Sequence, residues 1–154
     1  MALEHILEIF QQQLPTSELH HHIKKRNRVR LEHFVGSLPS FLIKTLSNRY
    51  KHILVVYPDA ESAEFMQGDL NELSVHNPLY FPPTHHKPYD DNQVIDTNVM
   101  VQRSEVLERI VDSEEYVVST STSALFEKIA SSESFNEASL LVEVGDEIQP
   151  DYLR

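Results

Sequence analysis

The stretch RVRLEHFVGSLPSFLIKTL, residues 28–46, predicts a strand, a short loop and a helix in that order. Apolar and polar side chains alternate from Arg28 to Val35, as they do along a β-strand. An apolar helix follows, for which Ser37 is a suitable N-cap. Pro39 suits its first turn because the N–H that proline lacks has no helical partner there. The unit therefore has the order of a phosphate-binding loop.

The loop of this unit lacks most of the residues that hold a phosphate. Such a loop needs glycines for close backbone approach, a lysine for the phosphate charge and a Ser or Thr for magnesium. Only Gly36 and Ser37 are present here, and the whole chain has only 3 glycines. We therefore interpret Gly36 and Ser37 as a degenerate phosphate position, and we expect no catalytic residue and no bound cofactor in this segment.

Composition limits the class of protein. A length of 154 residues suits one domain, with room for the beginning of a second. The formal charge of -11 opposes close approach to nucleic acid unless a local basic patch overrides it. The chain has no cysteine, no apolar run long enough to cross a bilayer and no basic start of a secretion signal. These features favour a soluble protein of the cytoplasm that makes no membrane contact.

Alternating strand and helix patterns predict an α/β fold with a mostly parallel sheet and helices on both faces. Two N-terminal helices precede the sheet, the second capped by Thr16 or Ser17. The run His52–Tyr57 is continuously apolar, as in a parallel strand covered on both faces. A long loop is expected from Pro82 to Thr97. The predicted strands are 28–35, 52–57, 78–81, 116–120 and 140–144.

The last predicted strand, 140–144, is followed by a turn at Gly145. A new helical pattern starts near Ile148 and has run for about one turn at Arg154. We expect this sequence to be a piece of a longer protein.

Histidines and acids offer weak metal candidates. The run His20–His22 lies on a predicted helix, where consecutive side chains point about 100° apart and cannot converge on one ion. We expect it to be exposed helix surface. His85 and His86 lie in the long loop with Asp90 and Asp91, and solvated loop residues are the favoured interpretation.

Three other polar features are candidate binding or catalytic groups. Five hydroxyls, Ser119–Ser123, follow a parallel strand, but the Gly-x-Ser-x-Gly elbow of hydrolases is absent and Thr122 or Ser123 is expected to cap a helix. Asp59 follows another strand at a position suited to a ribose, without a glycine-rich fingerprint. The basic run Lys24–Arg28 either contacts a phosphate backbone or acidic partner, or is a solvated helix end, which is favoured.

The order of these segments resembles one known family, the UvrB-like N-terminal module of the bacterial transcription-repair coupling factors (Mfd). The resemblance covers nearly the whole chain, and no single motif decides it. Its carriers are FVGS at 34–37, ILVVYPDAESA at 53–63, LYFP at 79–82 with PY at 88–89, QRSEVL at 102–107, VVST at 117–120 with ALFEK at 124–128, and LVEVGDEI at 141–148.

The resemblance implies a degenerate RecA-like helicase core that has lost its ATP site and most of its DNA-separating hairpin. Tyr89 is the one tyrosine where UvrB has an aromatic-rich hairpin. The implied role is non-catalytic docking and autoregulation within an ATP- and magnesium-dependent translocase on double-stranded DNA. That parent displaces stalled RNA polymerase and recruits UvrA, mainly through a small domain that would begin near Leu140. The resemblance thus implies a UvrB-like α/β domain over residues 1–138 and the start of a small α+β, UvrA-binding domain over residues 139–154.

Two alternatives from other classes stay open at this stage. One is a nucleotide-binding enzyme domain with an unorthodox phosphate site at Gly36 and Ser37 and carboxylates at Asp59 or Asp90. Nucleotide titration by calorimetry separates it from the docking module. The other is a UvrB relative that binds DNA itself, for which a gel shift with a steep salt dependence is the test.

Overall fold

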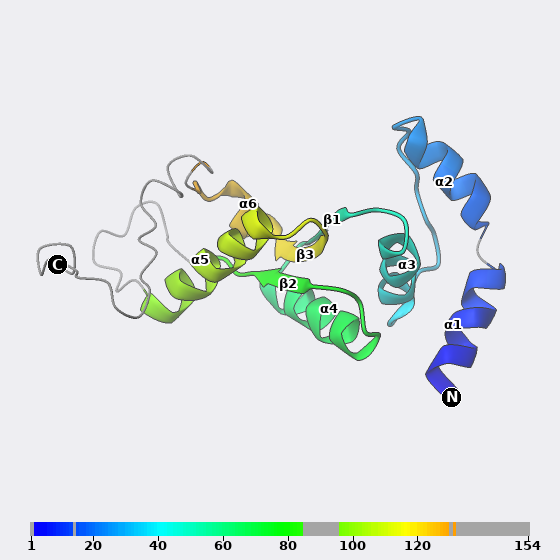
Figure 1. Ribbon diagram of the computed structural model, residues 1–154, viewed down its shortest axis with the longest axis horizontal. Helices are drawn as coiled ribbons and strands as arrows, with labels where there is room; N and C mark the ends of the chain where they lie inside the picture. Colours follow the sequence, from blue (N-terminus) through cyan, green and yellow to red (C-terminus); the bar gives the residue numbers. More distant parts are fainter. Residues whose placement is uncertain (1, 14, 85–95, 130, 132–154) are drawn as a thin grey trace, which may run out of the picture.

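The computed structural model describes residues 2–13, 15–84, 96–129 and 131 (Figure 1). Its helices are α1 (Ala2–Gln13), α2 (Thr16–Lys24), α3 (Leu38–Ser47), α4 (Ala60–Glu72), α5 (Thr97–Asp112) and α6 (Thr122–Phe126). Its strands are β1 (His52–Tyr57), β2 (Pro78–Phe81) and β3 (Tyr116–Ser121). The predicted strand at 140–144, the small domain at 139–154 and most of the long loop lie outside the described residues.

The three strands form one parallel sheet in the order β1-β3-β2. The last of the described strands is therefore the central one, and β1 and β2 are the two edges of the described sheet. Ile53 pairs with Val117, and Leu79 pairs with Val118. The predicted α/β class and the three strand positions are confirmed.

Helices pack on both faces of the sheet, as predicted. On one face, α4 and α3 cover a core built from Met66, Leu70, Leu73, Val75 and Val117. On the other, α5 and α6 pack on a second core built from Leu79, Phe81, Val106, Val118 and Ala124. Adjacent residues of β3 enter opposite cores because side chains alternate along a strand.

The strand predicted at residues 28–35 is absent, and this prediction is wrong. The segment runs from α2 to α3 without a strand partner, and Val29, Leu31 and Val35 are exposed. His33 adopts a φ of 63°, which interrupts an extended backbone. Alternation specifies which side chains would share a face, but a strand also needs a neighbour for its backbone hydrogen bonds, and none lies beside this segment in the described sheet.

The expectation that β1 is covered on both faces is also wrong. Its side chains alternate between exposed and half-buried. Ile53, Val55 and Tyr57 pack against the core under α4. Leu54 and Val56 point to the opposite face, where they remain 59% and 41% exposed.

The N-terminal helices form at the predicted positions. Pro15 is the N-cap of α2, so the predicted cap at Thr16 or Ser17 is wrong. The ring of Phe10 on α1 contacts those of Phe34 and Phe41, with ring centroids 6.4 and 5.8 Å apart. These aromatic contacts attach α1 to α3.

Candidate functional site

The predicted phosphate position is a turn that leads into α3. Gly36 has a φ of 60°, a conformation that favours glycine, and an added Cβ would meet nothing within 4 Å. Ser37 is the N-cap residue but its side chain makes no capping hydrogen bond, and Pro39 lies in the first turn as predicted. Because no strand precedes this turn, the Gly36 position lacks the strand-loop-helix order of a phosphate loop.

The Gly36 turn and the other nucleotide candidate, Asp59, lie near opposite ends of α4. Ser40, in the first turn of α3, donates a 2.7 Å hydrogen bond to Asp69 in the last third of α4. Asp59 immediately precedes the first turn of the same helix. Since α4 runs for 13 residues, about 1.5 Å each, the two candidates are near opposite ends of it. Asp90, the third candidate, lies outside the described residues.

Asp59 occupies the N-terminus of α4, where an anion would bind. Its carboxylate accepts hydrogen bonds from the Ser62 N–H at 2.7 Å and from the Ser62 hydroxyl at 3.0 Å. These hydrogen bonds lower the pKa of the Asp59 carboxyl below its usual value. The helix end is therefore already neutralised by a negative charge of the chain itself.

The hydroxyls of Ser119–Ser123 make hydrogen bonds to other groups of the same chain. Ser119 and Thr120 are buried and donate to the backbone oxygens of Leu79 and Phe81, at 3.3 and 2.8 Å. These two contacts join β3 to β2.

The other three hydroxyls of the run close the exit of β3. Ser121 accepts from the Ala124 N–H as the N-cap of α6, so the cap predicted at Thr122 or Ser123 is wrong by one or two residues. Ser121 and Ser123 are linked at 2.8 Å, and Thr122 donates to the Pro58 oxygen at 3.0 Å. Every hydroxyl of the run thus has a hydrogen-bond partner among the described residues, and none of those partners is a His, Asp or Glu side chain.

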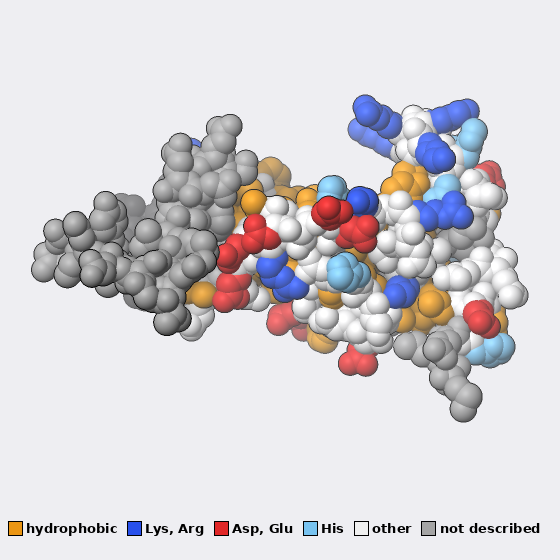
Figure 2. All heavy atoms as spheres, in the orientation of Figure 1, with side chains coloured by type: hydrophobic (Ala, Val, Ile, Leu, Met, Phe, Trp, Pro, Cys, Tyr) orange, Lys and Arg blue, Asp and Glu red, His pale blue; other side chains and the backbone are white. Residues whose placement is uncertain are grey.

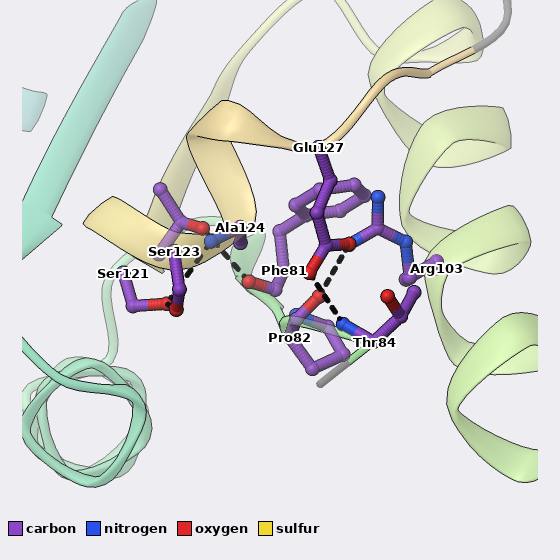
Figure 3. Close-up of polar contacts among 9 residues, drawn as sticks. Phe81, Pro82, Thr84, Arg103, Ser121, Ser123, Ala124 and Glu127 are labelled. Carbon is purple, nitrogen blue, oxygen red and sulfur yellow. Dashed lines mark hydrogen bonds and ion pairs between the residues drawn. The ribbon is translucent and has the colours of Figure 1, made fainter. Parts of the chain in front are cut away.

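A buried ion pair, which sequence reasoning missed, holds the exits of β2 and β3 together (Figure 3). The Arg103 guanidinium on α5 lies 2.9 Å from the Glu127 carboxylate and donates to the Pro82 oxygen at 2.6 Å. Its carbon is 4.1 Å from the centre of the Phe81 ring, a cation–π contact. The other Glu127 oxygen accepts from the Thr84 N–H at 2.8 Å. One charged pair therefore joins three segments.

Both side chains of this pair are largely shielded from solvent. The Arg103 side chain is 7% exposed and that of Glu127 is 20% exposed. Burial lowers the pKa of Arg103 and the neighbouring Glu127 charge opposes that change. The signal in the sequence was the position of Arg103 on the same helical face as Val106, at i+3, where the pattern otherwise places apolar residues. The pair links α5 to the segments that follow β2 and α6, which is a structural role.

An apolar groove opens on the sheet face beneath α5 and α6. Its volume is about 310 Å³, and it follows the exposed side of β1. The ring of Tyr116 stacks on His52 at one end, with ring centroids 4.6 Å apart. The groove is lined by His52, Ile53, Leu54, Phe81, Leu107, Ile110, Tyr116, Val118, Thr120, Leu125 and Ile129. Its apolar lining suits a protein surface better than a charged ligand.

The histidine run is partly buried, which corrects the expectation of an exposed helix surface. His20 is 7% exposed, and its Nδ1 lies 3.1 Å from the Tyr50 hydroxyl. Burial, with the charges of Arg49 and Lys24, lowers the pKa of His20. Within the described residues, no three His, Cys, Asp or Glu side chains are arranged to hold a metal ion. His85, His86 and Asp91 lie outside those residues.

Comparisons with protein-family models, with curated proteins and with solved structures found no match. None of the described helices combines the length and apolar character that crossing a lipid bilayer requires.

Proposed function

We propose that this chain is a non-catalytic docking module of a bacterial transcription-repair coupling factor, similar to the UvrB-like module of Mfd. Three of the motifs that carry this resemblance coincide with elements of the sheet and the helices that follow its strands. Residues 53–63 span β1 and the start of α4, residues 79–82 span the end of β2, and residues 117–128 span β3 and α6. Of the others, residues 102–107 lie on α5, residues 34–37 form a turn that no strand precedes, and residues 88–89 and 141–148 lie outside the described residues. The finer fold in this proposal is a RecA-like core whose phosphate site has degenerated.

The observation that carries the proposal is the contrast between polar and apolar surfaces around the sheet. At the carboxyl ends of its strands, where α/β proteins bind ligands, the Ser119–Ser123 hydroxyls and Asp59 are engaged within the chain. The apolar groove beside β1 has no such internal partner among the described residues, and Leu54 in it is 59% exposed. This arrangement suits contact with protein better than phosphate chemistry.

In this role the segment contributes binding surface rather than chemistry. ATP and magnesium would be used by a motor elsewhere in the proposed parent, which would also contact double-stranded DNA and RNA polymerase. UvrA would be recruited mainly through the small domain beginning near residue 139, outside the described residues. The apolar groove is the surface we assign to packing against the other domains of that parent.

Calorimetric titration with ATP and ADP in the presence of magnesium tests the non-catalytic part of the proposal. We expect no saturable heat at micromolar nucleotide. Saturable binding would overturn the proposal in favour of a nucleotide-binding enzyme domain, and loss of that binding in Gly36→Val or Asp59→Ala would locate the site.

A second experiment tests docking on the motor. The chain is added to a coupling factor from which the corresponding module has been removed, and DNA-stimulated ATP hydrolysis is measured. We expect the rate to fall, and Leu54→Glu in the groove to restore it, because a buried charge opposes apolar packing. Phe65→Glu is the matched control, since Phe65 is 69% exposed on α4 away from the groove. An unchanged rate, or equal restoration by both variants, would contradict docking through the groove.

A further inference from the structure

A cluster of cations surrounds the end of α2. We call Lys24, Lys25, Arg26 and Arg28 the basic tip. All four are exposed, and none makes an ion pair with another described residue. Figure 2 shows Lys and Arg side chains gathered around the end of α2, apart from the Asp and Glu side chains visible near the sheet. The tip is therefore a free, localised positive surface.

Charge is segregated along the chain. Residues 20–31 contain no acidic residue, and 24–30 contain 5 of the 13 Lys and Arg residues. The remaining 8 basic and 24 acidic residues give the rest of the chain a formal charge of -16. Exposed charges interact over about 8 Å at physiological salt, so a partner at the tip is attracted locally while a long anion is repelled by the remainder.

Arg26 holds its place at the tip in a conformation that favours glycine. The Arg26 N–H donates to the Ile23 oxygen and the Asn27 N–H to the His22 oxygen, at 2.9 and 3.0 Å. This is the Schellman pattern that ends a helix. Arg26 is the residue of that pattern with a left-handed backbone, and its φ is 56°. Glycine adopts that conformation without strain, whereas a residue with a Cβ does not. Backbone strain of this kind marks candidate functional positions.

The segment after the tip adds apolar side chains and free backbone groups. Val29 and Leu31 are 42% and 40% exposed, and they alternate with Arg28 and Arg30. Between Arg28 and Phe34 no backbone group makes a hydrogen bond to another described residue. An extended peptide could satisfy such groups by strand addition.

We propose that the basic tip and residues 28–31 form a docking surface for an acidic protein segment that carries interspersed apolar side chains. The cations match its carboxylates, and Val29 and Leu31 match its apolar residues. A nucleic acid backbone would use the cations but not the apolar side chains, and it would approach the negatively charged remainder of the chain. This surface is distinct from the groove and does not depend on the function proposed above.

Fluorescence anisotropy with three labelled probes tests this surface at about 150 mM salt. The probes are a peptide of alternating glutamate and valine, an all-glutamate peptide of equal charge, and a short DNA duplex. We expect saturable binding of the alternating peptide, weaker binding of the all-glutamate peptide and none of the duplex. No saturable peptide binding, or tighter binding of the duplex, would overturn the proposal.

Charge-reversal variants locate the contact. Lys25→Glu with Arg28→Glu should weaken binding of the alternating peptide at least about tenfold, because attraction becomes repulsion. Lys51→Glu with Lys128→Glu makes the same change in net charge at exposed positions outside the tip and should leave binding within about twofold. Lys51 also loses ion pairs with Glu114 and Glu115, so the thermal midpoints of both double variants are measured to show that each remains folded. Equal loss in both double variants would show a nonspecific charge effect and contradict the docking surface.

Two further variants separate binding from folding. Arg26→Gly should raise the thermal midpoint, because glycine relieves the left-handed strain, while it weakens peptide binding. Val29→Ser with Leu31→Ser should weaken binding of the alternating peptide and leave that of the all-glutamate peptide unchanged. If both peptides were affected equally, the apolar part of the surface would be refuted.

Discussion

The two faces of the sheet differ in how completely helices cover them. Under α4, Ala63 and Leu70 are fully buried and Met66 is 3% exposed. On the other face, α5 and α6 cover β2 and β3 but leave Leu54 and Val56 of β1 exposed. One face therefore holds a closed core, and the other leaves an apolar area exposed, which is the area proposed above as a docking surface.

The largest expected effect comes from opening the closed face. Leu70→Ala should lower the free energy of unfolding by about 3 to 4 kcal/mol, because it removes buried side-chain contacts and leaves a cavity. Leu54→Ala, the same substitution on the open face, should change it by less than about 0.5 kcal/mol. Urea denaturation followed by circular dichroism measures both. Similar values for the two variants would mean that the faces do not differ as described.

The next largest effect is expected for the Arg103–Glu127 ion pair, which joins α5 to the segments after β2 and α6 on the open face. Glu127→Leu leaves the Arg103 charge buried without its carboxylate and should cost about 2 to 3 kcal/mol. Adding Arg103→Met should recover much of that loss, because the unpaired charge is then removed. The same denaturation experiment, analysed as a double-mutant cycle, gives the coupling between the two residues. Additive losses would show that the pair is not coupled.

A smaller effect is expected at the N-terminus of α4, the helix of the closed face. Hydrogen bonds from Ser62 lower the pKa of the Asp59 carboxyl below 3.8, the usual value for an aspartate. They therefore stabilise the folded state above about pH 4, where the carboxyl is ionised. That stabilisation is lost as the pH falls through the lowered pKa. Asp59→Ala should therefore melt at a lower temperature than the unsubstituted chain at about pH 7, with the difference shrinking at about pH 2. A constant difference between those pH values would exclude the carboxylate as its cause.

The smallest effect on stability is expected for a charge placed in the open groove. Leu54→Glu should leave the unfolding midpoint nearly unchanged while it lowers the fluorescence of a dye that binds exposed apolar surface. Phe65→Glu should lower the dye fluorescence less than Leu54→Glu does, since Phe65 lies outside the groove. Unfolding of the Leu54 variant would show that the groove is part of the core.

The sequence predicts the strands well where the local pattern is sufficient. The apolar runs that became β1 and β2 have the predicted bounds, and β3 is one residue longer than predicted. Residues 28–35 have an equally clear alternation but no strand, because alternation cannot reveal whether a neighbouring strand is available. Likewise, the apolar run of β1 does not reveal that β1 lies at an edge of the described sheet, where one of its faces is left open.

The polar groups of the candidate site were harder to predict for an electrostatic reason. Arg103 and His20 belong to residue types that normally lie at the surface or are intermediate, and both are buried here. Their burial depends on partners distant in sequence, Glu127 for Arg103 and Tyr50 for His20. The hydroxyls of 119–123 were correctly placed at the exit of a strand, but their backbone acceptors on β2 depend on sheet order, which composition does not specify.

The order β1-β3-β2 has a consequence for how the chain folds during synthesis. Among the described strands, both edge strands pair only with β3, which begins at Tyr116. Residues before Tyr116 can form helices as they leave the ribosome, yet they cannot form any backbone ladder of this sheet. The exposed apolar strands must therefore wait for the central one, and a nascent chain halted before residue 116 would present two unpaired strands to chaperones and to aggregation.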